Sequence, residues 1–306
     1  MIGNRQNAIR LFQFKGIDLF LHWSWFLVAA YEISDRQRAY DSVIWNILEY
    51  ISLFVIVMLH EFGHALACRQ VGGDANRIVL WPLGGVAYVN PPQRPGATLW
   101  SIAAGPLVNV ALLPILIIVS RMIRVLGPAQ SMPNGLLLLK SIVIINISLL
   151  IFNMLPIYPL DGGQILRALL WYVMGRAYSL MAATIVGFAG VAGLAVFALK
   201  SQSIWLGLLS AYVFMNCWQG MKKARVLLRI AKLERHVGYS CPSCKMPPPL
   251  GEYWRCSACA KPFDTFRTQA VCPQCSTQFP TTACLDCGRA YPITEWSSAI
   301  PVPTGN

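Results

Sequence analysis

Charged residues are scarce in this sequence: they make up 12% of its 306 residues, whereas hydrophobic residues make up 56%. The mean hydropathy is +0.51. A water-soluble enzyme carries more charge than this, so the composition excludes that class and is typical of an integral membrane protein. A spanning helix needs roughly 20 apolar residues. We therefore predict six spans, at residues 17–33, 43–68, 97–120, 135–156, 178–199 and 203–220.

Cysteine is scarce outside the C-terminal tail, which holds eight of the ten cysteines as four C-x-x-C pairs. Thiols paired in this way bind metal in a reducing compartment, which predicts a cytosolic tail. Two pairs close a tetrahedral four-cysteine zinc site. We predict two structural zinc ribbons, at residues 240–264 and 270–295; sequential pairing is the simplest choice, although four pairs allow three pairings. The ligands would be Cys241, Cys244, Cys256, Cys259, Cys272, Cys275, Cys284 and Cys287.

Basic residues are concentrated near the C-terminus: from Lys222 onwards, eleven Lys and Arg stand against five Asp and Glu. Together with the even number of spans, this bias predicts that both termini lie in the cytosol, and we expect a bacterial inner membrane. Residues 221–239 would form a basic linker helix, either along anionic headgroups or as a plain connector. The tail lacks the basic and aromatic stripe of a nucleic-acid binder, so a cytosolic protein is the expected partner of the ribbons. Residues 296–306 are predicted to be disordered.

The second span carries the pattern H-E-x-x-H at residues 60–64. Positions i and i+4 share one face of a helix, so His60 and His64 could bind the same Zn²⁺, and Glu61 could take a proton from water beside it. Such short patterns also occur by chance. Polar groups at membrane depth cost about 2.5–3.5 kcal/mol each on insertion scales, however, and this favours a functional role.

A third ligand is predicted at Asp161, where span 4 runs into the sequence NMLPIYPLDGG. Pro156 and Pro159 end the helix and force extended backbone, and Gly162 and Gly163 permit a close approach. A catalytic zinc site needs three protein ligands and one open position. The alternative role for Asp161 is that of an N-cap for a helix at residues 164–174.

Residues 76–90 predict a small β-hairpin beside the metal site, with Pro82 and two glycines between its strands. It would be either a plain connector or an exposed edge to which an unwound peptide could add as a strand. Four further polar residues are not expected to bind metal: His22, Glu49, Cys68 and Cys217. We expect His22 to be interfacial or packed, and the two cysteines to pack. We place Glu49 near the outer end of its span, within reach of water.

These motifs resemble the site-2 protease family of intramembrane zinc metalloproteases. The resemblance rests on HEFGH at 60–64, WPLGG at 81–85, GPLVN at 105–109, the N-x-x-P and P-L-D-G motifs at 153–162 and the opening GIDLFLHWSW at 16–25, and it covers roughly residues 10–220. It implies a zinc ion bound by His60, His64 and Asp161, with Glu61 as the base. It also implies that Asn109 and Asn153 hold the substrate or the oxyanion.

We therefore expect an all-α polytopic membrane protein of about six transmembrane helices in residues 1–220, with a small β-hairpin beside the active site and Cys₄ zinc-ribbon modules. Its function would be the hydrolysis of a peptide bond in or near the transmembrane segment of membrane-protein substrates. One catalytic and two structural zinc ions are expected. The alternatives are a metal transporter and a catalytically idle membrane scaffold that presents the ribbons.

Overall fold

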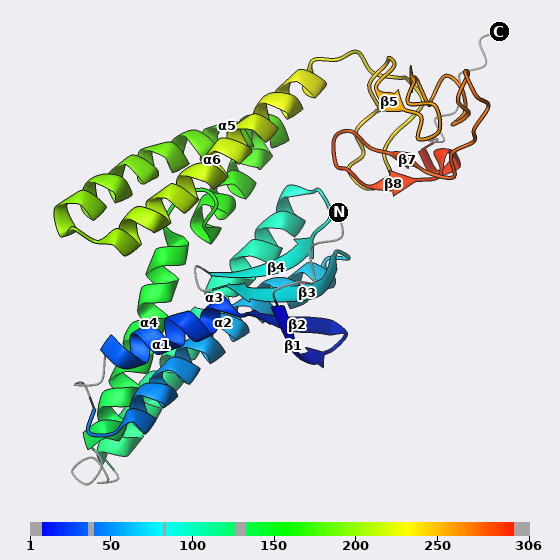
Figure 1. Cartoon of the computed structure of the whole chain (residues 1–306). Coiled ribbons are helices and arrows are strands. Elements are labelled where there is room, and N and C mark those ends of the chain that lie inside the picture. The colour runs from blue at the N-terminus through cyan, green and yellow to red at the C-terminus, as the bar shows by residue number, and fades with distance from the viewer. Residues whose placement is uncertain (1–7, 36–39, 82–83, 126–132, 297–306) are drawn as a thin grey trace.

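The computed structural model describes residues 8–35, 40–81, 84–125 and 133–296. Long helices carry a small four-stranded sheet near one end, and a cysteine-rich module lies beyond the sheet (Figure 1). The helices of the described residues are α1 (Ser24–Asp35), α2 (Val43–Gln70), α3 (Pro95–Val125), α4 (Pro133–Met154), α5 (Asp161–Ser201) and α6 (Ile204–Ala231).

Four of these helices, α2 to α5, are long and apolar enough to cross a membrane. Most of their apolar surface faces outward: only 6% of the apolar window of α4 is buried inside the protein. An α-helix satisfies its own backbone hydrogen bonds, so an apolar outer surface of this kind suits a surrounding of lipid tails. Helix α6 is as long as α2 but more polar, so its crossing of the membrane stays a prediction.

The first predicted span, residues 17–33, is wrong over its first third. Residues Ile17–His22 form strand β2, and the helix that follows, α1, has 12 residues. At 1.5 Å per residue α1 is about 18 Å long, short of the roughly 30 Å of a bilayer core. Ile17 and Leu19 are fully buried and Asp18 between them is not, and this alternation is the period of a strand.

The sheet has the strand order β1-β2-β3-β4, with β1 at Ala8–Phe14, β3 at Asp74–Trp81 and β4 at Gly84–Asn90. Strands β2 and β3 are parallel because α1 and α2 connect them as a crossover, whereas the other two pairs are antiparallel. The predicted hairpin at residues 76–90 is confirmed as β3 and β4, although Pro82 lies outside the described residues. Strand β4 is an edge strand.

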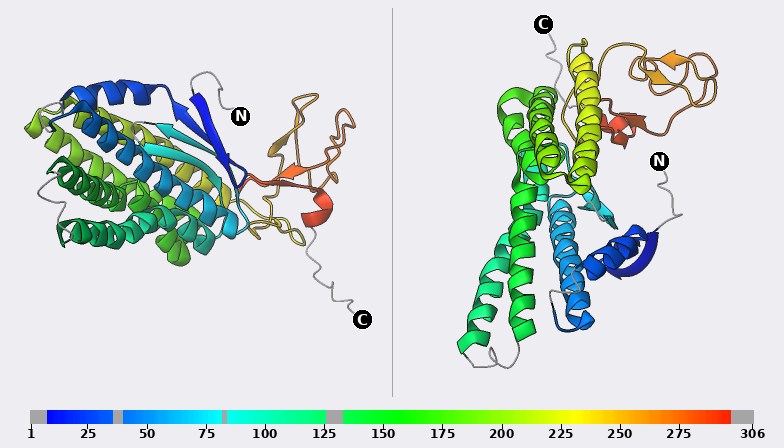
Figure 2. Two further views of the ribbon diagram at one scale, coloured as in Figure 1. Left: turned by 90° about the horizontal axis from the view of Figure 1, so that it is seen from below. Right: turned by 60° about the vertical axis from the view of Figure 1, so that its left-hand side comes forward.

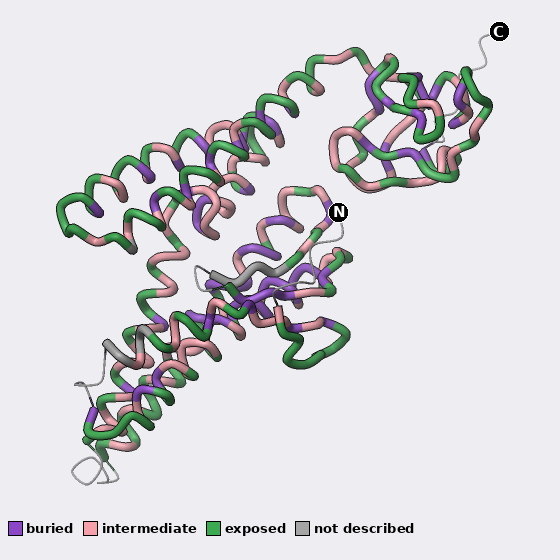
Figure 3. The backbone as a smooth tube through the Cα atoms, viewed as in Figure 1, coloured by how far each residue is buried: buried purple, intermediate pink, exposed green. Residues whose placement is uncertain are grey.

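The main core lies where this sheet packs on the end of α2. Leu19 and Ile78 from the sheet pack with Ala65 and Cys68 from the helix, and all four are at most 1% exposed. Burial of a large aliphatic side chain is worth about 1.5–3 kcal/mol, so this contact fixes the end of α2 relative to the sheet. Figure 3 shows buried positions gathered at this junction, while the far ends of the helices are mostly exposed or intermediate.

Helix α5 is broken at Gly175, whose φ of 78° and ψ of 172° are compatible with glycine but strained for other residues. The two parts correspond to the predicted helix at 164–174 and the predicted span at 178–199. Helix α6 runs from the predicted sixth span into the basic linker without interruption. Ala224 and Leu227 pack it against α5, so much of the linker belongs to a helix pair.

The cysteine-rich module contains two small antiparallel sheets and a short 3₁₀ helix, Ile293–Trp296. Trp296 is fully buried in it, so the predicted disordered segment begins one residue too early; residues 297–306 lie outside the described residues. The strands pair as β5 (Trp254–Arg255) with β6 (Pro262–Phe263), and β7 (Thr282–Ala283) with β8 (Ala290–Tyr291).

Candidate metal centres

The structure brings His60, His64 and Asp161 together, as the sequence predicts. The two imidazole Nε2 atoms lie 3.1 Å apart, and Asp161 Oδ2 lies 3.1 Å from that of His60 and 3.3 Å from that of His64. Ligands about 2.0–2.2 Å from a tetrahedral zinc ion are separated by roughly 3.3–3.6 Å. The three atoms therefore match three corners of such a site, within a few tenths of an ångström.

Hydrogen bonds to α3 orient both imidazoles. His64 Nδ1 lies 2.9 Å from the Ser101 carbonyl oxygen, so it donates, and Nε2 is left with its lone pair. His60 Nδ1 lies 2.6 Å from Oδ1 of Asn109, whose amide nitrogen donates to Asn146 in turn. Three electron-pair donors thus converge on one point, which is the arrangement that a cation stabilises.

The sequence analysis missed Ser101 and Asn146. Ser101 acts through its backbone carbonyl, which no residue pattern reveals. Asn146 is a fully buried amide in the middle of the apolar helix α4, and its amide nitrogen also donates to the carbonyl oxygen of Asn109 at 3.0 Å. An isolated amide in an apolar span could have identified it, because such a group needs a partner in lipid.

Glycines make room for this cluster. A Cβ atom on Gly105 of α3 would lie 2.9 Å from His60 Nε2 and closer still to His64. A Cβ atom on Gly162 or Gly163 would collide with the backbone of Met154 or Tyr158, so the glycine pair allows the turn that delivers Asp161. Helix α5 begins at Asp161 and its N-cap position is Leu160, so the alternative reading of Asp161 as the cap is wrong.

The other predicted residues of this site have distinct positions. Glu61 is 6% exposed on α2, and its charge acts on His64. Asn153 is half-buried in the last turn of α4. Asn109 has both ends of its amide engaged, one with His60 and the other with Asn146. These contacts suit a residue that orients the imidazole of His60.

His22, Cys68 and Cys217, the three residues that we expected to be packed or interfacial, are packed. Cys68 and Cys217 are fully buried, and the rings of His22 and Trp81 stack with centroids 4.0 Å apart. Glu49 does not reach water as predicted: it is 6% exposed and accepts a 2.6 Å hydrogen bond from the hydroxyl of Tyr40.

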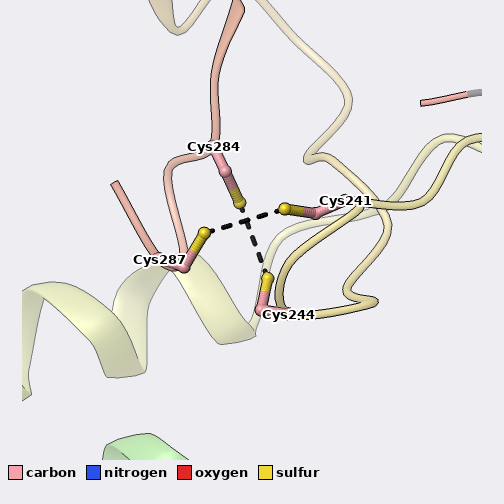
Figure 4. A group of neighbouring side chains, drawn as sticks. All are labelled: Cys241, Cys244, Cys284 and Cys287. Carbon is pink, nitrogen blue, oxygen red and sulfur yellow. Dashed lines mark hydrogen bonds between the residues drawn. The ribbon is translucent and has the colours of Figure 1, made fainter. Parts of the chain in front are cut away.

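The eight tail cysteines form two groups, but the sequential pairing is wrong. The first and fourth C-x-x-C pairs form one group, Cys241, Cys244, Cys284 and Cys287, which we call the outer cysteine site (Figure 4). The second and third pairs form the inner cysteine site, Cys256, Cys259, Cys272 and Cys275. Residues 240–264 and 270–295 are therefore not two self-contained ribbons, because the outer site joins the two ends of the module.

Sulfur separations in both sites fit zinc. They are 3.7 Å for Cys241–Cys287 and Cys244–Cys284 in the outer site. Four sulfurs about 2.3 Å from a tetrahedral zinc ion lie roughly 3.8 Å apart. In the inner site, a hydrogen bond with the Thr277 hydroxyl is the largest cause that lowers the pKa of the Cys275 thiol, to about 6. A lowered pKa favours the thiolate, which is the form that binds metal.

Each C-x-x-C pair has the same local backbone. The residue after the second cysteine has a positive φ and donates to the carbonyl oxygen of the first cysteine. These residues are Lys245, Ala260, Ser276 and Gly288. The aromatic residues that recur four positions after the second cysteine all join the module's core, where the rings of Phe263 and Phe279 stack at 5.6 Å.

Comparison with known proteins decides the family. Residues 49–134 and 119–197 match peptidase family M50. A zinc metalloprotease of Methanocaldococcus jannaschii is 34% identical over 221 residues, which cover 72% of this chain. The solved structure of a site-2 protease from the same organism is 33% identical, with a TM-score of 0.53, and the match covers 70% of this chain and 95% of that one. The chain belongs to peptidase family M50, the site-2 proteases.

The comparisons thus confirm the resemblance drawn from the motifs, and with it a zinc metalloprotease family of membrane proteins. Stage IV sporulation protein FB of Bacillus subtilis is 31% identical over 120 residues, 38% of each chain. This M50 chain spans 62% of the length of the M. jannaschii metalloprotease. The family match ends at residue 197, before the cysteine-rich module begins.

Proposed function

We propose that this M50 chain is an intramembrane zinc metalloprotease of the H-E-x-x-H type, which hydrolyses a peptide bond in or near the transmembrane segment of membrane-protein substrates. The observation that carries the proposal is the convergence of His60, His64 and Asp161 within 3.1–3.3 Å. They come from α2 and α5, each of which is long and apolar enough to span a bilayer. Glu61, the expected base, is next to His60 on the same helix.

The three side chains would hold a zinc ion through His60 Nε2, His64 Nε2 and Asp161 Oδ2. When bound there, the ion supplies a Lewis acid that polarises the scissile carbonyl and makes a neighbouring water more acidic. The residues fit this group, because both Nδ1 atoms act as hydrogen-bond donors and both Nε2 lone pairs remain available. Structural zinc in the two cysteine sites would bring the number of ions to three.

Glu61 carries the proton in this reaction. Its carboxylate takes a proton from the attacking water while the water oxygen bonds to the carbonyl carbon. The C–N bond then breaks, and Glu61 returns the proton to the departing amine nitrogen. The products are a carboxylic acid and an amine, and Glu61 ends in its starting state. Asn109 is engaged by His60 and Asn146. Asn153, half-buried at the end of α4, is therefore the asparagine that would contact the substrate or the oxyanion.

A helical substrate must unwind before its carbonyls become accessible, because the helix engages them in hydrogen bonds. Strand β4 offers an edge to which an unwound segment could add by backbone pairing. Strand β3, its only neighbour in the sheet among the described residues, packs on α2, the helix that bears both histidines. This arrangement supports the edge-strand role of the hairpin over that of a plain connector.

The topology is part of the proposal. We place the chain in a bacterial inner membrane with both termini in the cytosol, as the basic residues after Lys222 and the thiols of the tail favour. The cysteine-rich module then lies on the cytosolic side, where a cytosolic protein is its expected partner.

The test is cleavage of candidate single-span substrates co-expressed with the wild-type chain or with Glu61→Gln. We expect Glu61→Gln to abolish cleavage, because glutamine cannot accept the proton. Glu49→Gln is the matched control on the same helix, since Glu49 bonds to Tyr40 and lies outside the metal cluster. Equal cleavage by wild type and Glu61→Gln would remove the protease assignment and leave the idle scaffold.

The metal transporter is the less favoured alternative. A transporter needs ligands in series along a path through the membrane. Among the described residues, the only group of metal-ligating side chains within the helices is the compact cluster of His60, His64 and Asp161.

A further inference from the structure

The outer cysteine site lies next to the end of strand β4, in the four-stranded sheet that packs on α2. Arg289, two residues after Cys287, donates a 3.0 Å hydrogen bond from Nη2 to the carbonyl oxygen of Asn90. The same guanidinium nitrogen lies 4.0 Å from a carboxylate oxygen of Asp74, the first residue of β3. The side chain of Arg289 is 20% exposed, whereas that of Asp74 is 76% exposed, so the contact lies at the protein surface.

The backbone conformation of the Cys284–Cys287 pair orients Arg289, which follows it in the chain. Its carbonyl oxygen accepts a 2.8 Å hydrogen bond from the backbone nitrogen of Cys284, and Gly288 donates back to Cys284 at 2.7 Å. The φ of Gly288 is 79°, a value that suits glycine. Small modules of this kind derive much of their folding energy from bound metal. The presentation of Arg289 therefore depends on the metal site.

Electrostatic attraction between the outer cysteine site and helix α5 also supports docking of the module. Four thiolates around one Zn²⁺ carry a net charge of −2. Arg176, on α5 just after the break at Gly175, is attracted by Cys244, Cys284 and Cys287 and by Asp286. Its Nε and Nη1 atoms are buried and have no hydrogen-bond partner among the described residues. A buried cation without its own hydrogen bonds is stabilised when a negative site faces it.

A third arginine fixes the cysteine pair to the end of α6. Arg235 binds Asp286, which lies between Cys284 and Cys287, through two nitrogens at 2.7 and 3.3 Å. It also donates to the carbonyl oxygens of Ile230 and Pro247. Bidentate arginine–carboxylate pairs are directional, so this pair holds the outer site close to the helix pair α5 and α6.

We propose that the outer cysteine site is a metal-dependent docking surface for this chain's own membrane domain. When metal fills the outer site, Arg289 and Arg176 hold the cysteine-rich module at the end of β4. When the metal is lost, Arg289 is no longer presented, the negative charge facing Arg176 is dispersed, and the module detaches from the sheet. The inner site folds its own part of the module but makes neither contact.

One consequence rests on the proposed function. If substrates add to the edge of β4, the docked module stands beside the end of that edge and its metal content would affect their access. The docking itself does not depend on proteolysis, so it can be tested without a substrate.

The experiment is site-specific photo-crosslinking in the full-length protein, with Asn90→p-benzoylphenylalanine as the probe. The side chain of Asn90 is exposed and its backbone carbonyl, the group that Arg289 binds, is retained. Mass spectrometry then measures the yield of crosslinks from position 90 to peptides of residues 240–296. We expect a strong crosslink in the zinc-loaded protein, which falls to background in Cys284→Ser and after exhaustive zinc chelation.

Three further variants make the result decisive. Arg289→Gln combined with Arg176→Gln should lose the crosslink while both tail zinc ions are retained, whereas Arg267→Gln, an exposed arginine of the same module, should keep it. Cys256→Ser, which removes an inner ligand, should also keep it. A crosslink that survives Cys284→Ser or the double arginine variant would overturn the proposal, and so would an equal loss in Cys256→Ser. The expected crosslink yields stay the same if the chain proves not to be a protease.

Discussion

The Oδ1 atom of Asn109 lies 2.6 Å from Nδ1 of His60, and both side chains are buried between α2 and α3. An amide oxygen at this distance holds the imidazole with Nδ1 protonated and directs Nε2 towards His64 and Asp161. Asn146 on α4 fixes Asn109 in turn: it accepts a 2.8 Å hydrogen bond from the side-chain amide of Asn109 and donates one of 3.0 Å to its backbone carbonyl oxygen. The orientation of one ligand thus depends on three helices.

The first prediction concerns Asn146. Asn146→Leu removes both bonds that fix Asn109, so His60 loses its defined orientation, and we expect zinc affinity at the histidine site and kcat/KM to fall about 10–100-fold. Zinc retained after dialysis against graded chelator measures the affinity. Asn216→Leu is the control and should change neither quantity, because among the described residues the Asn216 amide bonds only to the Tyr212 carbonyl oxygen on its own helix. An unchanged affinity in Asn146→Leu would show that the bond to Asn109 is dispensable.

The second prediction concerns Gly105. In Gly105→Ala the new Cβ would lie 2.9 Å from His60 Nε2, within the space where the metal would bind, so we expect loss of the zinc ion at the histidine site and of activity. Alanine favours a helix over glycine by about 1 kcal/mol, so thermal stability should not fall for reasons of helix propensity. The control is Gly193→Ala on α5, where the added Cβ would meet no described atom within 4 Å beyond its own stretch of helix. If Gly105→Ala retained the zinc ion of the histidine site, the proposed position of that ion would be refuted.

The sequence predicted the convergence of His60, His64 and Asp161 because its determinants are local. H-E-x-x-H sets two imidazoles on one helical face, and the proline and glycine residues around Asp161 mark a turn that no regular helix could contain. The hairpin of β1 and β2 was not predicted, because its sequence signal cannot be separated from that of the adjacent helix. Strand β2 lies within one apolar run, so its alternation of buried Ile17 and Leu19 with Asp18 was hidden by the helix that follows.

The pairing of the cysteines could not be predicted from local pattern. All four C-x-x-C pairs have the same backbone conformation, so each is equally able to join any other. The choice is made by contacts distant in sequence. Trp254 donates a 2.9 Å hydrogen bond to the carbonyl oxygen of Ala283, which brings the fourth pair across the module, and Trp296 joins the core that both sites share.

The third prediction is the zinc content. The described residues contain three groups able to bind metal, so we expect three zinc ions per chain. His60→Ala should remove one of them and leave the two in the tail, because the cysteine sites share no ligand with the histidine site. Atomic absorption on purified protein measures the ratio. A content of two in wild type that His60→Ala leaves unchanged would restrict metal to the cysteine sites.

The fourth prediction separates nested from sequential pairing. In protein loaded with ¹¹³Cd²⁺, each four-cysteine site gives its own NMR signal, because the chemical shift of the ion reports its ligands. If the outer site joins the first and fourth pairs, Cys241→Ser and Cys284→Ser should abolish or shift the same signal, and Cys256→Ser and Cys272→Ser should affect the other. Sequential pairing would instead couple Cys241 with Cys256. That result would also remove the docking surface, since Arg289 would then belong to a site formed within residues 270–295 and no longer tied to Cys241.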